Sequence, residues 1–120
     1  MASRFTELVV GCADPKPLGR FWSQVLDWPI TEEDDESAYL EDPEDRGPSL
    51  LFIRVPEGKT VKNRLHIDVN PRGVAQQEEV ERVLTLGARR IDIGQGPDVS
   101  WVVLADPEGN EFCILKTTVD

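Results

Sequence analysis

One order of elements occurs twice along the chain, and this repetition restricts the fold more than any other feature of the sequence. In the first half, alternating residues over Phe5–Cys12 predict a strand, and apolar residues at helical spacing up to Leu26 predict an amphipathic helix. The second half restarts with an alternating segment, Arg64–Asn70, followed by a helix that ends at Gly87. Three short strand candidates follow each helix: Trp28–Thr31, Ala38–Glu41 and Ser49–Val55, then Arg89–Ile93, Val99–Leu104 and Glu111–Lys116. Each half therefore consists of a strand, a helix and three strands.

The length of the chain suits one domain built from two such modules. It has 120 residues, and the 39% that are hydrophobic are spread along it, so that a core can form. One βαβββ module alone buries little apolar surface. We therefore expect residues 1–120 to form a single α+β domain, with module one at about residues 4–56 and module two at about residues 63–117.

Composition excludes several classes of function. The chain carries 13 Lys and Arg against 23 Asp and Glu, a net charge of −10, which argues against nucleic acid as a partner because phosphate binding needs clustered basic residues. The longest apolar run, Trp101–Ala105, is too short to span a membrane, and the first residues lack the apolar core of a signal peptide. The two cysteines fit a reducing compartment. We expect a cytoplasmic protein.

Three segments resemble the vicinal oxygen chelate superfamily, which has the glyoxalase/bleomycin-resistance/dioxygenase fold. The resemblance covers nearly the whole chain and is nearest to the small glyoxalase-like domains. Its segments are Asp14 with Gly19–Trp22 and Val25–Leu26, then Asn63–Val69, and the most specific one, Asp106–Cys113. The resemblance implies that each module contributes a curved sheet and that the two together form a cupped mixed sheet. It also implies a homodimer.

In the metal enzymes of that superfamily, four residues from the first and last strands of the two modules hold one divalent ion. Glu7 and His66 occupy the places of the two first-strand ligands. Both side chains can coordinate a transition metal. The ligand position in the last strand of module one falls on an apolar residue, Leu51 or Ile53, and neither can coordinate a metal ion.

The fourth ligand place falls on Cys113, and Glu111, two residues earlier on the same face, is the alternative if the register differs. A thiolate would favour zinc or copper over harder ions. A mixed Glu, His and Cys set is unusual for this fold. We therefore expect either no cofactor or one divalent ion, with zinc, manganese, iron, nickel and cobalt as candidates.

Each candidate site residue also has a structural alternative. His66 either contacts a ligand or is structural, and Asp68 on its face could hold its tautomer. Glu7 either lies at a pocket with a partner, which burial would require, or is exposed to solvent. Cys113 ligates, reacts or packs, and packing is the common role of a free cysteine. Trp101 either stacks on a planar ligand or packs.

From these residues we predict a protein that binds a small, partly aromatic molecule in its cup, without a full metal site. The expected ligand-binding residues are Glu7, Phe52, His66, Asp68, Trp101 and Cys113. The alternative is a metal-dependent lyase, isomerase or dioxygenase in which Glu7 is base or ligand and His66 anchors the ion. Metal-free acid–base catalysis by Glu7, His66 and Asp68 and a purely structural interaction module remain open. The acidic residues of 32–36 and 41–45 form a solvated rim or attract a cationic ligand.

Overall fold

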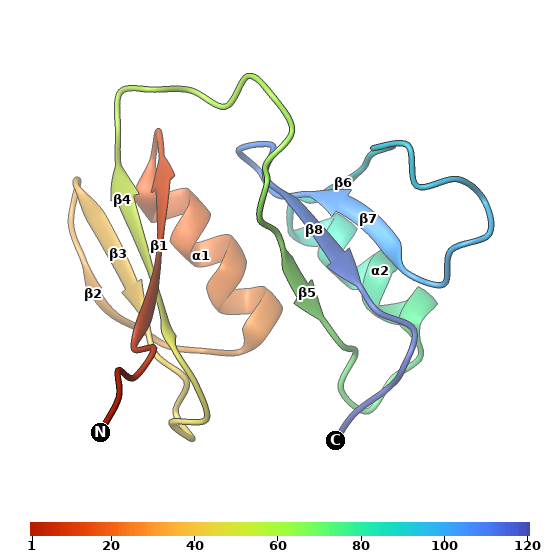
Figure 1. Cartoon of the computed structure of the whole chain (residues 1–120), viewed down its shortest axis with the longest axis horizontal. Helices are drawn as coiled ribbons and strands as arrows, with labels where there is room; N and C mark the ends of the chain where they lie inside the picture. Colours follow the sequence, from red (N-terminus) through yellow and green to blue (C-terminus); the bar gives the residue numbers. More distant parts are fainter. The chain divides into compact units, whose positions relative to one another are not determined.

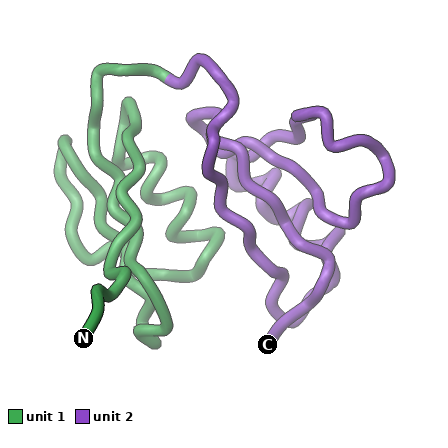
Figure 2. The backbone as a smooth tube through the Cα atoms, in the orientation of Figure 1, with its two compact units in different colours: residues 1–58 green, residues 59–120 purple.

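A computed structural model describes all 120 residues, which form two compact units, residues 1–58 and residues 59–120 (Figure 1, Figure 2). The elements of the first unit are β1 (Glu7–Cys12), α1 (Pro15–Leu26), β2 (Ile30–Glu33), β3 (Ser37–Leu40) and β4 (Ser49–Arg54). Those of the second unit are β5 (Ile67–Val69), α2 (Gln76–Leu86), β6 (Arg89–Arg90), β7 (Val102–Ala105) and β8 (Glu111–Ile114). Neither helix has the length and apolar character needed to cross a membrane.

The two units have the same sheet topology. In the first unit the strand order is β1-β4-β3-β2, and β1 runs parallel to β4 whereas the other pairs are antiparallel. In the second unit the order is β5-β8-β7-β6, with β5 parallel to β8. The predicted α+β fold with two tandem βαβββ modules is confirmed.

Helix α1 covers one face of the first sheet. Its apolar stripe, which includes Leu18, Phe21 and Trp22, is buried against the residues of β3 and β4 on that face. The helix can approach closely because residue 19 is glycine: a Cβ added there would lie 2.7 Å from the Cβ of Ala38. The helix begins at Pro15, since Asp14 is extended and a proline fits the first helical position.

Helix α2 covers one face of the second sheet in the same manner. Val80 and Val83 on the helix and Phe112 and Ile114 on β8 are fully buried. The helix ends at Gly87, as predicted, where a positive φ of 123° closes the last turn.

All four strands of the second unit are shorter than the sequence predicted. Strand β5 has three residues instead of seven, and Leu65, expected on its apolar face, is 79% exposed. Just before the predicted segment, the backbone N–H of Asn63 donates to the carboxylate of Glu111. Strand β7 begins at Val102, so that Trp101 precedes it.

Candidate functional site

The uncovered face of the first sheet has an apolar centre. Strand pairing sets Val9, Leu51 and Tyr39 side by side across β1, β4 and β3. Their neighbours in sequence alternate to the opposite face, where Leu50 and Phe52 are buried under α1. Val9 remains 51% exposed. The sheet face opposite α1 therefore presents two aliphatic side chains and one phenol.

The prediction that Phe52 contacts a ligand is corrected by this register. Phe52 is 1% exposed and lies in the core under α1. Because side chains alternate along a strand, Phe52 cannot share the open face with its neighbours Leu51 and Ile53.

Glu7 is the first residue of β1, and alternation sets it on the same face as Val9. It is exposed, and it pairs across the sheet with Ser49. The expected charged partner does not occur within the first unit. An exposed carboxylate needs none, because water solvates it.

The negative charge is concentrated in the first unit. Residues 1–58 contain 13 Asp and Glu and five Lys and Arg, which gives a net charge of −8. Residues 59–120 contain ten Asp and Glu and eight Lys and Arg, which gives a net charge of −2. Around the β2–β3 turn, exposed ion pairs join Lys16 to Asp35 at 3.1 Å and Arg20 to Glu33 at 3.2 Å. The surplus of carboxylates gives the first unit a field that attracts cations.

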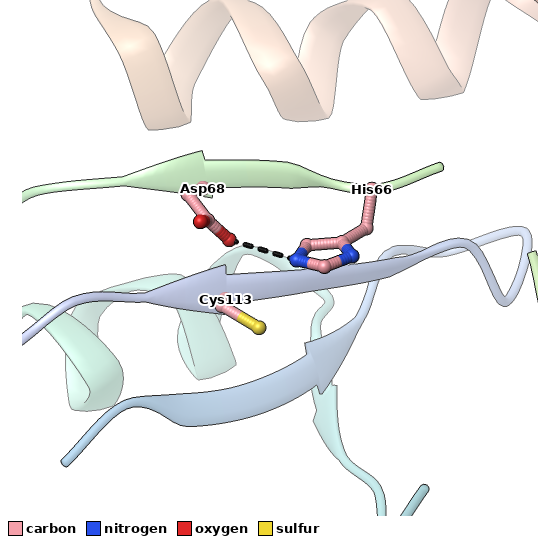
Figure 3. Close-up of side chains that lie close together, drawn as sticks. All are labelled: His66, Asp68 and Cys113. Carbon is pink, nitrogen blue, oxygen red and sulfur yellow. Dashed lines mark ion pairs between the residues drawn. The ribbon is translucent and has the colours of Figure 1, made fainter. Parts of the chain in front are cut away.

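In the second unit, three predicted site residues lie together. Nε2 of His66 lies 3.0 Å from Oδ1 of Asp68, and Asp68 and Cys113 are Cα partners in the parallel pair β5–β8. The three side chains offer nitrogen, oxygen and sulfur ligand atoms that all lie within 4.8 Å of one another. Figure 3 shows His66 and Asp68 facing each other from one segment of chain and Cys113 on the adjacent strand.

The thiol of Cys113 is neutral at physiological pH. Burial raises its pKa to about 11, and the charge of Asp68 and hydrogen bonding with it act in the same direction. Cys113 in the unliganded protein is therefore a poor nucleophile, since the thiolate is the reactive form.

Glu111, the alternative last-strand ligand, is held by other groups. Its carboxylate lies 3.0 Å from Nζ of Lys59 and accepts the N–H of Asn63 at 3.2 and 3.3 Å. Burial alone raises the pKa of Glu111, but Lys59 and the backbone N–H groups, including that of Asn63, outweigh it, and the net pKa is lowered. Sequence reasoning missed Lys59, because no local signal joins it to β8.

The turn before β8 accounts for the most specific segment of the sequence. Asp106 is buried, and its carboxylate accepts the backbone N–H groups of Glu108 and Asn110 at 2.9 Å each. Gly109 has a positive φ of 88°, which glycine adopts without strain. This turn fixes where β8 begins and thereby sets Glu111 and Cys113 in register.

The family model of the glyoxalase-like domain matches residues 7–115. The chain belongs to this family. No curated protein matches the sequence.

Solved structures similar to this glyoxalase-like domain share its fold. The fosfomycin resistance protein FosX from Listeria monocytogenes, as a mutant complexed with Mn(II) and 1S,2S-dihydroxypropylphosphonic acid, is 13% identical with a TM-score of 0.74; the match covers 98% of this chain and 95% of that one. FosX from Mesorhizobium loti is 15% identical with a TM-score of 0.70, covering 98% and 94%. A glyoxalase/bleomycin resistance protein/dioxygenase family enzyme from Burkholderia phytofirmans PsJN is 18% identical with a TM-score of 0.68, covering 98% and 100%.

The four-ligand arrangement implied by the superfamily does not fit this glyoxalase-like domain. Neither Leu51 nor Ile53 has a donor atom, and Phe52 between them lies in the core. The last-strand place holds the neutral thiol of Cys113 in place of a carboxylate. The donor groups that do lie together, in His66, Asp68 and Cys113, all belong to the second unit.

Proposed function

We propose that this glyoxalase-like protein binds a small, partly aromatic molecule on the uncovered face of its first sheet, and that this binding needs no metal ion. The observation that carries the proposal is the row of Val9, Leu51 and Tyr39, in which apolar side chains occupy the face where a chelating residue would be needed. Apolar contact and stacking on the phenol ring of Tyr39 require a complementary shape and an apolar surface, but no reactive group. The resemblance implies the same for the antibiotic-sequestering members of the superfamily, which need shape and stacking but no reactive group.

The charge of the first unit supports a cationic or zwitterionic ligand. A net charge of −8 on 58 residues raises the local concentration of cations and accelerates their association. Glu7 lies on the same sheet face as Val9 and supplies a carboxylate beside the apolar row. Trp101, 40% exposed in the second unit, remains a predicted stacking residue.

Two dyes of opposite charge test this proposal. Thioflavin T is a planar aromatic cation, and 1-anilinonaphthalene-8-sulfonate is an aromatic anion of similar size. We expect the full-length protein to bind thioflavin T more tightly, and Val9→Asn to weaken that binding about three- to tenfold because apolar contact area is lost. Val61→Asn is the matched control, because Val61 is 75% exposed outside the first sheet. Absence of thioflavin T binding, or equal losses in both variants, would contradict the proposal.

A metal-dependent lyase, isomerase or dioxygenase is the second candidate, and the His66–Asp68–Cys113 cluster is the observation that favours it. In such an enzyme the ion would polarise a substrate oxygen, and a neighbouring carboxylate would move the proton. A compound with two adjacent oxygens, turned over by the metal-loaded protein and left unchanged in chelator, would establish this function. Turnover that persists in chelator would instead indicate metal-free acid–base catalysis by His66 and Asp68.

We further propose that the protein is a cytoplasmic homodimer, as its resemblance to the superfamily implies. The absence of any disulfide between its two buried cysteines, Cys12 and Cys113, is compatible with a reducing compartment. Sedimentation equilibrium of the full-length protein tests the dimer, since a single species of 13.5 kDa would exclude it.

A further inference from the structure

We propose that His66, Asp68 and Cys113 form a three-ligand site for one zinc-class ion within the second unit alone. This site includes Asp68 and requires no residue of the first unit, and so differs from the four-ligand set that spans both modules. It goes beyond the proposed function, because metal binding and dye binding on the first sheet are measured independently. A negative result for metal binding therefore does not contradict the proposed ligand binding on the first sheet, and a negative result for dye binding does not contradict the proposed metal site.

The local structure brings the three side chains to one face of the second sheet. His66 and Asp68 are two residues apart at the start of β5, so that extended backbone directs both side chains the same way. Asp68 is the Cα partner of Cys113 in β8. The opposite face of β8, with Phe112 and Ile114, is buried in the core. The cluster thus lies on the face that faces away from that core (Figure 3).

The ligand types select the ion. A thiolate, an imidazole and a carboxylate together suit zinc or cobalt better than magnesium or manganese, which prefer oxygen ligands. Three protein ligands leave one position of a tetrahedral ion for water or an exogenous ligand. Because Cys113 is buried whereas His66 and Asp68 are exposed, the sulfur lies at the base of the site and the open position faces solvent.

The distances require only a small adjustment. Ligand atoms around tetrahedral zinc lie roughly 3.3–3.8 Å apart, given bond lengths of about 2.0–2.3 Å. Nε2 of His66 and Oδ1 of Asp68 are already 3.0 Å apart, and the widest separation within the cluster is at most 4.8 Å. Rotation of the exposed His66 and Asp68 side chains closes that difference. Binding of the ion would release the thiol proton of Cys113 to solvent, because the thiolate is the form that ligates.

Glu111 does not compete for this ion. Lys59 and the backbone N–H of Asn63 hold its carboxylate, so that recruiting it would break this ion pair and this hydrogen bond. The ligand set is therefore predicted to be His66, Asp68 and Cys113, and not His66, Glu111 and Cys113.

Cobalt(II) titration of tag-free, full-length apoprotein tests the site, because cobalt bound to thiolate gives a near-ultraviolet charge-transfer band and reports its geometry in the visible spectrum. We expect one cobalt per chain and displacement by equimolar zinc. Cys113→Ser should abolish the charge-transfer band, and Cys12→Ser should retain it, since Cys12 is an equally buried cysteine in the first unit. His66→Ala and Asp68→Asn should each weaken cobalt binding at least about tenfold, whereas Glu111→Gln should not.

Three results would overturn the inference: no stoichiometric cobalt binding, a charge-transfer band that survives Cys113→Ser, or unchanged affinity in both His66→Ala and Asp68→Asn. The latter two variants alter exposed side chains and are expected to fold, so that they remain informative if Cys113→Ser does not. Thioflavin T titration of the same variants shows whether binding on the first sheet is intact.

Discussion

Asp68 lies directly opposite Cys113 in the parallel pair of strands β5 and β8, and its carboxylate raises the pKa of the Cys113 thiol. The larger contribution comes from burial of the thiol, which disfavours the charged thiolate. The two residues are 45 positions apart in the sequence, and only the strand pairing brings them together.

The first prediction concerns the reactivity of Cys113. In metal-free Cys12→Ala protein, alkylation by iodoacetamide should be slow at pH 8 and should rise with pH until about 11, because only the thiolate reacts. Asp68→Asn removes the neighbouring charge and should shift the profile to lower pH. The rate is measured by mass spectrometry of the intact protein. A profile that levels off near pH 9 in both proteins would contradict the assigned environment.

The second prediction concerns stability in acid. The pKa of Glu111 is lowered in the folded protein, so its contribution to stability is complete above the unfolded value of 4.5 and disappears as pH falls through the folded value. Glu111→Gln should cost about 1–3 kcal/mol of unfolding free energy at neutral pH, because charged hydrogen bonds to Lys59 and Asn63 are lost.

Urea unfolding between pH 3 and pH 7 measures this contribution. The difference between wild type and Glu111→Gln should stay constant above about pH 5 and shrink below 4.5. Glu78→Gln alters an exposed carboxylate on α2 and serves as the control, with an expected change within about 0.5 kcal/mol. A difference that does not depend on pH would mean that the charge of Glu111 does not stabilise the second unit.

The third prediction concerns the contact between α1 and the first sheet. Gly19→Ala should destabilise the protein by about 1–3 kcal/mol, because the new Cβ would lie 2.7 Å from the Cβ of Ala38. This cost exceeds the gain in helix propensity that alanine brings. Adding Ala38→Gly should relieve part of it. Gly47→Ala, where no atom lies within 4 Å, is the control in thermal denaturation, and equal melting temperatures for Gly19→Ala and the control would contradict the close packing.

The fourth prediction concerns the role of Glu7. Glu7→Gln should weaken thioflavin T binding a fewfold at low salt and leave the melting temperature unchanged, because the side chain is exposed. Glu57→Gln removes the same charge from the connector of the first unit and should have a smaller effect. If Glu7→Gln lowered the melting temperature by several degrees, Glu7 would be a structural residue.

The architecture was predictable because its signals are local. Alternation, helical spacing and the turn residues recur in both halves, and the terminating Gly87 is a single-residue signal. The alternation that sets Leu51 on the open face of the sheet buries Phe52 under α1, so that the ligand contact predicted for Phe52 was wrong.

The interactions around Glu111 could not be predicted in the same way. Asn63 and Glu111 are 48 positions apart, and the hydrogen bond between them joins the segment before β5 to the first residue of β8. No periodicity in either segment reports such a contact. The cluster of His66, Asp68 and Cys113 was predictable in its members, whereas the common position of their ligand atoms depends on the β5–β8 register.

The central claim is that a ligand binds to the first sheet without a metal ion, and the most direct measurement is calorimetric titration of thioflavin T into full-length protein dialysed against EDTA. The row of Val9, Leu51 and Tyr39 predicts binding with the same Kd, within about twofold, in EDTA and after addition of one equivalent of zinc. Binding that disappears in EDTA and returns with zinc would contradict the account and make the metal ion part of the binding site.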